Sequence, residues 1–372
     1  MRRSNQYHKC IRTLRPVAVL SILIILAATT TALAAGGLST ARSVAMGGAY
    51  IGLACGYDAA KYNPANLGFM EYRTTGIELA GVGTSISNNS FTLNDYNTYT
   101  GAYLTSKDKQ DILGKIPSEG LKLAIDAEAT ALGFSTGPWA LTTTGTASAA
   151  INLNKDIVDL ILNGNTVADT LSIQGSYSDA VGYASVGFSY GSQVAQWGSK
   201  RLSVGATARY IKGLGIERII ELEGLATTHD LGFAGQGEVI AQTATGGKGY
   251  ALDLGAALRI GNHHTIGLSI RNFLSSITWN KDTEEHGYIF QFDSMTVDNS
   301  DDDEIINSTE YTEDIPSFKT TLPSEMTLGF AKTSGNFIWA IDYIQGFRKE
   351  AAGASTKPRM ALGIEWSPIS FM

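Results

Sequence analysis

The chain has 372 residues, of which 44% are hydrophobic and 17% charged, and its formal net charge is −7. The first 34 residues carry five cations and no acid, so their removal would take the net charge from −7 to −12. Such an acidic protein does not fit nucleic-acid binding, which needs clustered lysine and arginine.

The N-terminus has the three parts of a secretory signal peptide. A basic region is followed by an apolar run, residues 17–28, and by Ala32-Leu33-Ala34. The run is too short to cross ~30 Å of hydrocarbon comfortably as a helix. We therefore expect residues 1–34 to be a signal peptide, with a retained N-terminal anchor as the alternative. Cys55 is then the one cysteine left, which excludes an internal disulfide.

Residues 35–70 lack the alternation of a strand. They combine many glycines and small residues with apolar ones, and Asn63-Pro64-Ala65-Asn66 forms a turn. A solvated tail would be more polar. We expect a compact segment with one or two short helices, packed against the rest of the protein.

From about Leu121 to Trp366, apolar residues alternate with polar or small ones. Leu252 and Leu254, for example, flank Asp253. A period of two indicates strands with two unlike faces. We expect ten to twelve strands, at the following places among others: 74–86, 120–136, 139–152, 180–190, 202–210, 250–259, 266–271, 326–330, 337–343 and 360–366.

The polar face of these strands carries charges of both signs, as expected for an all-β, antiparallel transmembrane β-barrel with lipid outside and polar side chains inside. Opposite charges can pair across a narrow lumen, which suits a plugged barrel better than an open pore. The residues expected to face the lumen are Lys122, Asp126, Glu128, Arg201, Arg209, Asp253, Arg259, Arg271, Asp342 and Glu365.

Aromatic residues near the strand ends fit the two membrane interfaces. In a soluble protein the same rings would be core. They are Trp139, Tyr190, Tyr210, Trp279, Tyr343 and Trp366.

The connections fall into two classes. Short turns are expected at 137–138, 261–262 and 334–336, and a long, polar, acidic loop at 281–322. Two short helices decorate the loops, at 106–114 with Ser106 as N-cap and at 155–162. The acidic run 301–304 has carboxylates that could hold calcium, but it lacks the glycine and spacing of an EF-hand loop, so a solvated loop is the better interpretation.

Catalytic motifs are missing from the sequence. The histidines have neither H-x-x-x-H nor H-E-x-x-H spacing, and there is no G-x-S-x-G elbow. The run 246–249 lacks the frame of a phosphate-binding loop and leads into a strand. We therefore expect no enzyme activity, no metal and no cofactor.

The N-terminal segment resembles the hatch of the long-chain fatty-acid transporter (FadL-type) superfamily. The resemblance is carried by ARSVAMGGA at 41–49 and DAAKYNPA at 58–65. Strands around 249–255 and 267–272, with the hairpins of 323–365, resemble the PorV-like branch. The residues matched to the hatch are Met46, Gly47, Gly48, Asn63, Pro64 and Ala65.

The resemblance implies a monomeric outer-membrane barrel of up to ~14 strands, with residues 35–70 as its plug and 71–372 as its wall. It implies passive uptake of hydrophobic small molecules such as fatty acids or hydrocarbons. The alternative is a structural or secretion-associated scaffold of the PorV type, which would bind a partner protein. The alternation breaks at Pro368, so we expect either a C-terminal truncation or a near-terminal aromatic role for Phe371.

Overall fold

The computed structural model describes residues 40–72, 75–164, 170–296, 305–348 and 355–367. The predicted signal peptide, the acidic run 301–304 and the tail 368–372 lie outside these ranges. Most of the described chain forms one antiparallel sheet of sixteen strands. The predicted all-β antiparallel class is therefore confirmed.

The strands are long where they follow one another through tight turns. Their bounds are β1 Gly76–Glu78, β2 Gly81–Asn88, β3 Leu121–Thr136, β4 Trp139–Leu153, β5 Thr170–Ser172, β6 Tyr177–Trp197, β7 Lys200–His229, β8 Gly232–Ala244, β9 Gly246–Ile260, β10 His264–Lys281, β11 Glu284–Met295, β12 Ile306–Asp314, β13 Phe318–Thr320, β14 Glu325–Ser334, β15 Phe337–Gly346 and β16 Arg359–Trp366.

Helices are short and lie in two places. Those of the N-terminal segment are α2 Ala41–Ala45, α3 Tyr57–Tyr62, η1 Pro64–Gly68 and η2 Met70–Tyr72. Those of the long connections are α4 Leu93–Tyr99, α5 Ser106–Lys115 and α6 Lys155–Asn163. No helix in the described ranges is long and apolar enough to cross a membrane.

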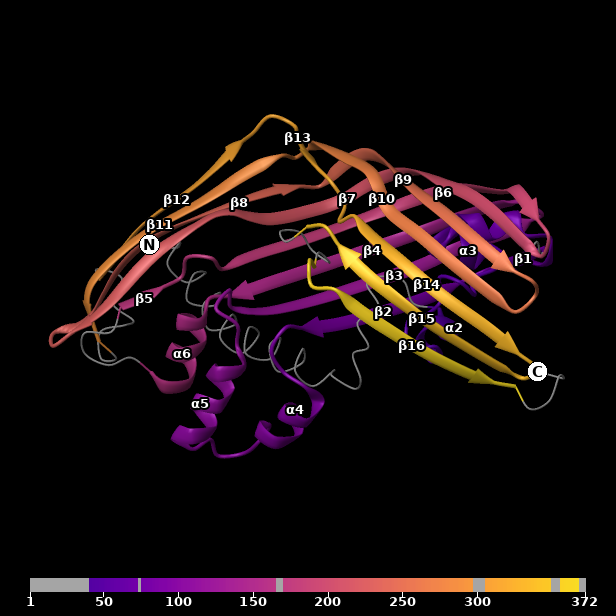
Figure 1. Cartoon of the computed structure of the whole chain (residues 1–372). Helices are drawn as coiled ribbons and strands as arrows, with labels where there is room; N and C mark the ends of the chain where they lie inside the picture. The colour runs from indigo at the N-terminus through magenta and orange to yellow at the C-terminus, as the bar shows by residue number, and fades with distance from the viewer. Residues whose placement is uncertain (1–39, 73–74, 165–169, 297–304, 349–354, 368–372) are drawn as a thin grey trace.

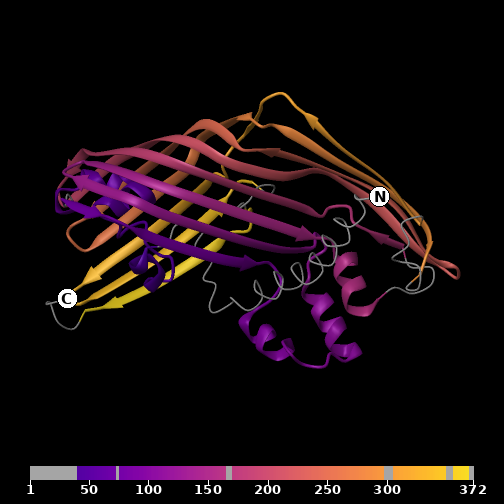
Figure 2. The same cartoon turned by 180° about the vertical axis from the view of Figure 1, so that it is seen from behind.

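The main path of the sheet contains ten strands in the order β1-β3-β4-β6-β7-β9-β10-β14-β15-β16. The sheet curls, so that β14–β16 face β3 and β4 across its concave side (Figures 1 and 2). Within the described residues, no strand pairing joins β16 to β1 or β2.

The two faces of the sheet are the reverse of those in a soluble protein. On the concave face, polar side chains are buried: Asp342 is 1% exposed, Thr207 1% and Asp253 7%. On the convex face, large apolar side chains are exposed: Leu328 is 48% exposed and Trp339 49%. Period-two alternation produces both faces at once, because successive side chains point to opposite sides of a strand.

Several connections differ from the sequence-based expectation. The predicted strand at 74–86 is two strands, β1 and β2, and the predicted polar stretch before residue 106 contains helix α4. Helix α5 is capped by Thr105 and not by Ser106, through a capping box with Asp108. Thr105 and Ser106 could both cap a helix. The acidic residue three positions after Thr105, Asp108, completes a capping box and decides between them.

The predicted loop 281–322 is wrong, because it contains β11, β12 and β13. Strand β7 is 30 residues long, and its second half pairs with β5 and β8 instead of β6 and β9. Together β5, the end of β7, β8, β11 and β12 form an arm that extends beyond the rest of the sheet (Figure 1). We expected between ten and fourteen strands; with these additional ones the sheet has sixteen.

Trp279 is also placed differently from expectation. It is 0% exposed, packs with Ile211 and Ile277, and donates from Nε1 to Thr320 Oγ1 at 2.8 Å. The other five aromatic residues expected at a membrane interface are exposed on the convex face. Two of them, Trp139 and Tyr190, contact each other with ring centroids 4.2 Å apart.

Candidate functional site

The N-terminal segment, residues 40–72, lies on the concave polar face of the sheet. Its second half is held by hydrogen bonds from side chains to backbone carbonyls, with the donor on the sheet in one case and on the segment in the other. Thr207 Oγ1 donates to Ala60 O at 3.0 Å, and Asn63 Nδ2 donates to Ala256 O at 3.2 Å. The sheet thus supplies hydrogen-bond partners to a segment with few intrahelical ones.

A row of glycines makes room for this segment. Gly191 on β6, Gly205 on β7 and Gly255 on β9 are neighbours in the register of the three strands. A Cβ at any of them would overlap the backbone or side chains of residues 63–68. The absent side chains therefore let the Asn63-Pro64 turn approach the strand backbones closely.

The first half of the segment meets β14, β15 and β16. Asp342 Oδ2 accepts hydrogen bonds from the amides of Tyr50 at 2.7 Å and Ile51 at 3.0 Å. Gly329 lies opposite Asp342 on β14, where a Cβ would overlap the carboxylate. A buried carboxylate thus binds two backbone donors, which is a strong, charge-assisted arrangement.

Ion pairs join the segment to the sheet at three further places. Lys61 lies 3.6 Å from Glu78 and 3.4 Å from Glu128. Glu71 pairs with Arg201 at 2.5 Å and Arg259 at 3.1 Å. Arg42 of α2 pairs with Glu365 of β16 at 3.0 Å.

The surroundings of two carboxylates in the segment shift their pKa values. Burial alone would raise the pKa of Glu71, but the hydrogen bond from Arg201 and the charge of Arg259 hold it below its usual value. Burial raises the pKa of Asp58, whose carboxylate accepts from the Tyr50 hydroxyl at 3.1 Å.

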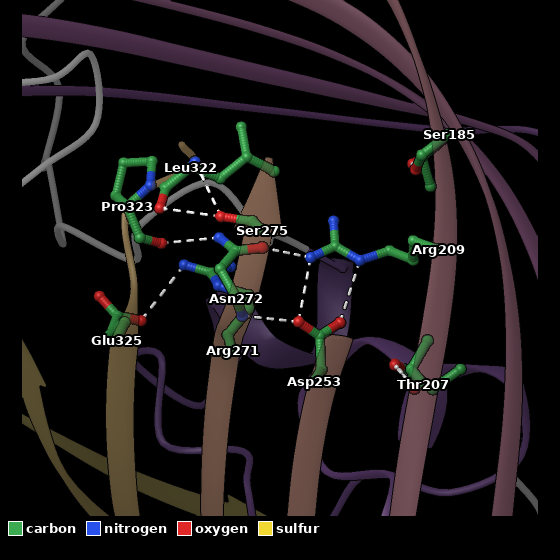
Figure 3. A network of polar contacts seen from close by, with 12 residues as sticks. Ser185, Thr207, Arg209, Asp253, Arg271, Asn272, Ser275, Leu322, Pro323 and Glu325 are labelled. Carbon is green, nitrogen blue, oxygen red and sulfur yellow. Dashed lines mark hydrogen bonds and ion pairs between the residues drawn. The ribbon is translucent and has the colours of Figure 1, made fainter. Parts of the chain in front are cut away.

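A second polar cluster lies on the same face, where side chains of β7, β9 and β10 meet residues 322–325 (Figure 3). Arg209 donates to both oxygens of Asp253, each at 3.0 Å, and also to Asn272 Oδ1. The backbone N–H of Asn272 donates to Asp253 Oδ1 at 2.7 Å, and its side-chain Nδ2 donates to Pro323 O at 2.6 Å. Asn272 has a φ of 52°, an uncommon conformation for a residue with a side chain.

Asn272 sits at an interruption of the sheet. On one side of β10, the pairing with β9 shifts between Ile270 and Leu274. On the other side, β10 pairs with β14 up to Arg271 and resumes with β13 at Ile277. Side chains fill the break, since Ser275 and Asn272 hydrogen-bond to residues 322–323 (Figure 3). Bulges of this kind are over-represented at functional positions.

The interior charges connect strands far apart in the sheet. Glu325 on β14 pairs with Arg271 at 3.2 Å and with Arg359 of β16 at 2.5 Å. Asp126 on β3 lies within the electrostatic range of both arginines. Because β3 and β16 are at opposite ends of the strand order, these interactions cross the concave space.

All ten residues expected to face a lumen lie on the concave face and are buried or half-buried. Lys122 additionally lies 5.8 Å from the ring centroid of Tyr177. Of the residues expected in a hatch, Met46, Asn63 and Ala65 are at most 1% exposed, Pro64 is buried, and Gly47 and Gly48 are half-buried.

Sequence reasoning missed other members of these clusters, among them Lys61, Glu71, Asn272, Glu325 and Arg359. Lys61 and Glu71 lie in helical turns outside the alternating pattern. Glu325 and Arg359 begin their strands, and a polar residue there reads as part of the preceding loop. A signal for Asn272 was present, since asparagine tolerates a positive φ and interrupts the run after Arg271.

The clusters mix carboxylates with guanidinium groups instead of gathering metal ligands. No group of three or more histidine, cysteine, aspartate or glutamate side chains in the described ranges could hold a metal ion. The arrangement provides fixed charge pairing and a tightly packed segment, with a strained break in the sheet nearby.

Comparison with known proteins places the chain in a family. A model of a family of unknown function (DUF5723) matches residues 64–237 and 220–334. The chain belongs to the DUF5723 family. The DUF5723 match begins at Pro64 in the buried turn and includes the Arg209–Asp253–Asn272 cluster. A search of curated proteins found no match.

Proposed function

We propose that this DUF5723 protein is a β-barrel of the bacterial outer membrane that lets hydrophobic small molecules pass by diffusion. In this proposal residues 40–72 are the plug, and the polar clusters line the lumen. Residues 1–34 would be the export signal, and the protein would act as a monomer without cofactor.

The observation that carries the proposal is the reversal of the two sheet faces. An apolar convex face would lie against lipid at favourable free energy, whereas exposure of so many large apolar side chains to water is rare in monomeric soluble proteins. Buried charges of the concave face such as Arg209 and Asp253 form ion pairs, and Asp342 accepts from two backbone amides, as a narrow polar interior requires. Tight turns at one end and long connections at the other match the asymmetry of outer-membrane barrels.

Aromatic pairs near the tight turns support the same orientation. Trp139 and Tyr190 follow or face the turn at 137–138, and Phe337 stacks on Trp366 with centroids 6.0 Å apart. These rings are exposed. An amphipathic ring is stabilised at the level of lipid headgroups.

The break beside Asn272 is the place at which a solute would leave the lumen sideways. Phe273 is 50% exposed and Leu274 53% on the convex face, while Asn272 lies in the buried polar cluster. Few backbone hydrogen bonds would have to open on the β13–β14 side of β10, because that side has no partner strand between residues 271 and 277, whereas the other side pairs with β9 again from Leu274.

Uptake of a labelled apolar solute by cells or liposomes tests the proposal. Deletion of residues 40–66 should change uptake, because the segment occupies the concave space. Asn63→Ala should act in the same direction but more weakly, since it removes only one side chain that bonds Ala256 and Ala65. Unchanged uptake in a deletion variant shown to be folded and inserted would reject transport.

The arm favours a second candidate, the scaffold that binds a partner protein. One face of the arm carries Glu221, Glu223, Glu238, Glu285 and Glu313. Glu223 faces Glu238 directly across two strands, and Glu285 faces Glu313. Opposed like charges destabilise a sheet, and a basic partner would relieve that repulsion.

Co-purification from the native envelope, read by mass spectrometry, distinguishes the two candidates. A scaffold should retain a basic partner protein in wild type and lose it in the double variant Glu223→Gln and Glu238→Gln. A transporter should show the same co-purified proteins in both.

A further inference from the structure

Both halves of the segment 40–72 pack on the sheet: Met46 and Ile51 lie in an apolar cluster with residues of β14–β16, and sheet glycines make room for both. The polar contacts of the two halves with the sheet are unequal. Residues 57–72 have the glycine row, hydrogen bonds to β7 and β9, and the ion pairs of Lys61 and Glu71. In the described chain, the polar contacts between residues 40–56 and the sheet are two: the Asp342 carboxylate with the Tyr50 and Ile51 amides, and Arg42 with Glu365.

Of these two contacts, the one at Asp342 is the stronger. Arg42 and Glu365 have side chains 41% and 31% exposed, and ion pairs so accessible to water contribute little. Asp342 is 1% exposed and accepts two hydrogen bonds with its charge. Hydrogen bonds to a charged group stabilise more than neutral ones.

The stretch that Asp342 holds is bounded on both sides by glycines with positive φ. Gly47 and Gly48 have φ values of 60° and 84°, and Gly56 has a φ of 59°. These glycines adopt a backbone conformation that other residues rarely reach, and they mark positions where the chain direction can change. Residues 49–55 between them include Cys55, a half-buried free cysteine.

We propose that Asp342 is a latch: its carboxylate keeps residues 46–56 against β14–β16, and loss of that interaction lets this stretch alone swing away while residues 57–72 stay in place. The plug would then open in part, on the side of β14–β16, without leaving the barrel. The opening of a passage rests on the proposed function of the segment as a plug. The latch itself concerns only the contact at Asp342.

Asp342→Asn tests the latch with almost no change of shape. Asparagine keeps one acceptor oxygen but loses the charge, and its amide group would present donors to the Tyr50 and Ile51 donors. Cys55 is the natural reporter, in the full-length protein carrying Cys10→Ser. Opening should raise the rate of maleimide labelling at Cys55 by at least about tenfold, because labelling follows the population of the open state.

Ser203→Ala is the matched control. It removes a buried hydrogen bond from Ser203 Oγ to Ala65 O, at 2.5 Å, in the other half of the same segment. Labelling of Cys55 should stay at the wild-type rate. Equal acceleration in this variant would mean that the segment loosens as a whole, which would overturn the latch.

Glu365→Gln covers the case in which Asp342→Asn fails to fold. It removes the second contact of the same half at a partly exposed site, and it should speed labelling by about two- to fivefold. Wild-type rates in every folded variant of Asp342 and Glu365 would overturn the latch. Faster labelling together with unchanged solute uptake would reject the transport function and leave the latch standing.

Discussion

At the scale of single residues, adjacent positions on one strand have opposite surroundings. Asp253 is buried, bonds both nitrogens of the Arg209 fork, and accepts from the Asn272 amide. Leu254, the next residue, lies on the convex face. Substitutions at the two positions should therefore destabilise the protein for different reasons.

Asp253→Asn should destabilise the protein by about 3–5 kcal/mol, because it leaves the buried Arg209 charge without its partner. The sequence alone suggests a smaller cost, since Asp253 reads there simply as a lumen residue. Leu254→Arg should cost about 2–4 kcal/mol, and only in a bilayer. Urea unfolding in liposomes and in detergent measures both. A cost for Asp253→Asn below that of a surface substitution would contradict the pairing.

At the scale of elements, the segment and the sheet fit through backbone contact. Gly205 lies under Pro64, whereas Gly182 on β6 has open space where a Cβ would be. The glycine row is thus specific to the region that the segment covers.

Gly205→Ala should displace the segment and increase its cleavage by protease, because the new methyl group overlaps the Pro64 carbonyl. Gly182→Ala is the control and should leave cleavage unchanged. Limited proteolysis with N-terminal sequencing of the fragments measures this effect. Equal resistance in both variants would mean that the segment is not seated on the glycine row.

Helices α4 and α5 are joined by one ion pair. Asp95 lies 2.9 Å from Lys115, and hydrogen bonds from Lys115 and Thr92 lower the pKa of Asp95 from 3.8 to about 2. Because the folded pKa is the lower one, this stabilisation is complete above about pH 4 and is lost as the pH falls toward about 2.

Amide hydrogen exchange in α4, corrected for the intrinsic rate, should therefore accelerate as the pH falls from about 4 to about 2. In Asp95→Asn it should already be fast at pH 7 and show no further change over that range. Wild-type protection that stays constant down to pH 2 would contradict the role given to this pair.

At the scale of the whole molecule, the sequence predicted what period two controls. β3 and β4 were expected at 120–136 and 139–152, close to their observed bounds, and the ten lumen residues share one face. The alternation within each strand's own sequence indicates its two faces, whichever strands it pairs with.

Features that depend on pairing partners could not be predicted in this way. The arm was missed because 284–295 and 306–314 mix polar and aromatic residues on both faces. Only the pairing of β11 with β8, and of β12 with β11, makes them strands. The break at Asn272 and the latch at Asp342 depend on contacts between residues far apart in the sequence. Trp279 was assigned to an interface because a ring near a strand end fits either a core or a membrane boundary.

The central claim, that the convex face lies against lipid, can be tested at two neighbouring positions of β14. Leu328 is 48% exposed on the convex face and Thr327 8% exposed on the concave face. Nitroxide labels on cysteines at these positions, in the full-length protein in liposomes, report contact with oxygen, which concentrates in lipid, or with a water-soluble nickel chelate. The account predicts that the label at 328 favours oxygen, while the label at 327 is shielded from it. A label at 328 that is relaxed mainly by the nickel chelate would contradict it.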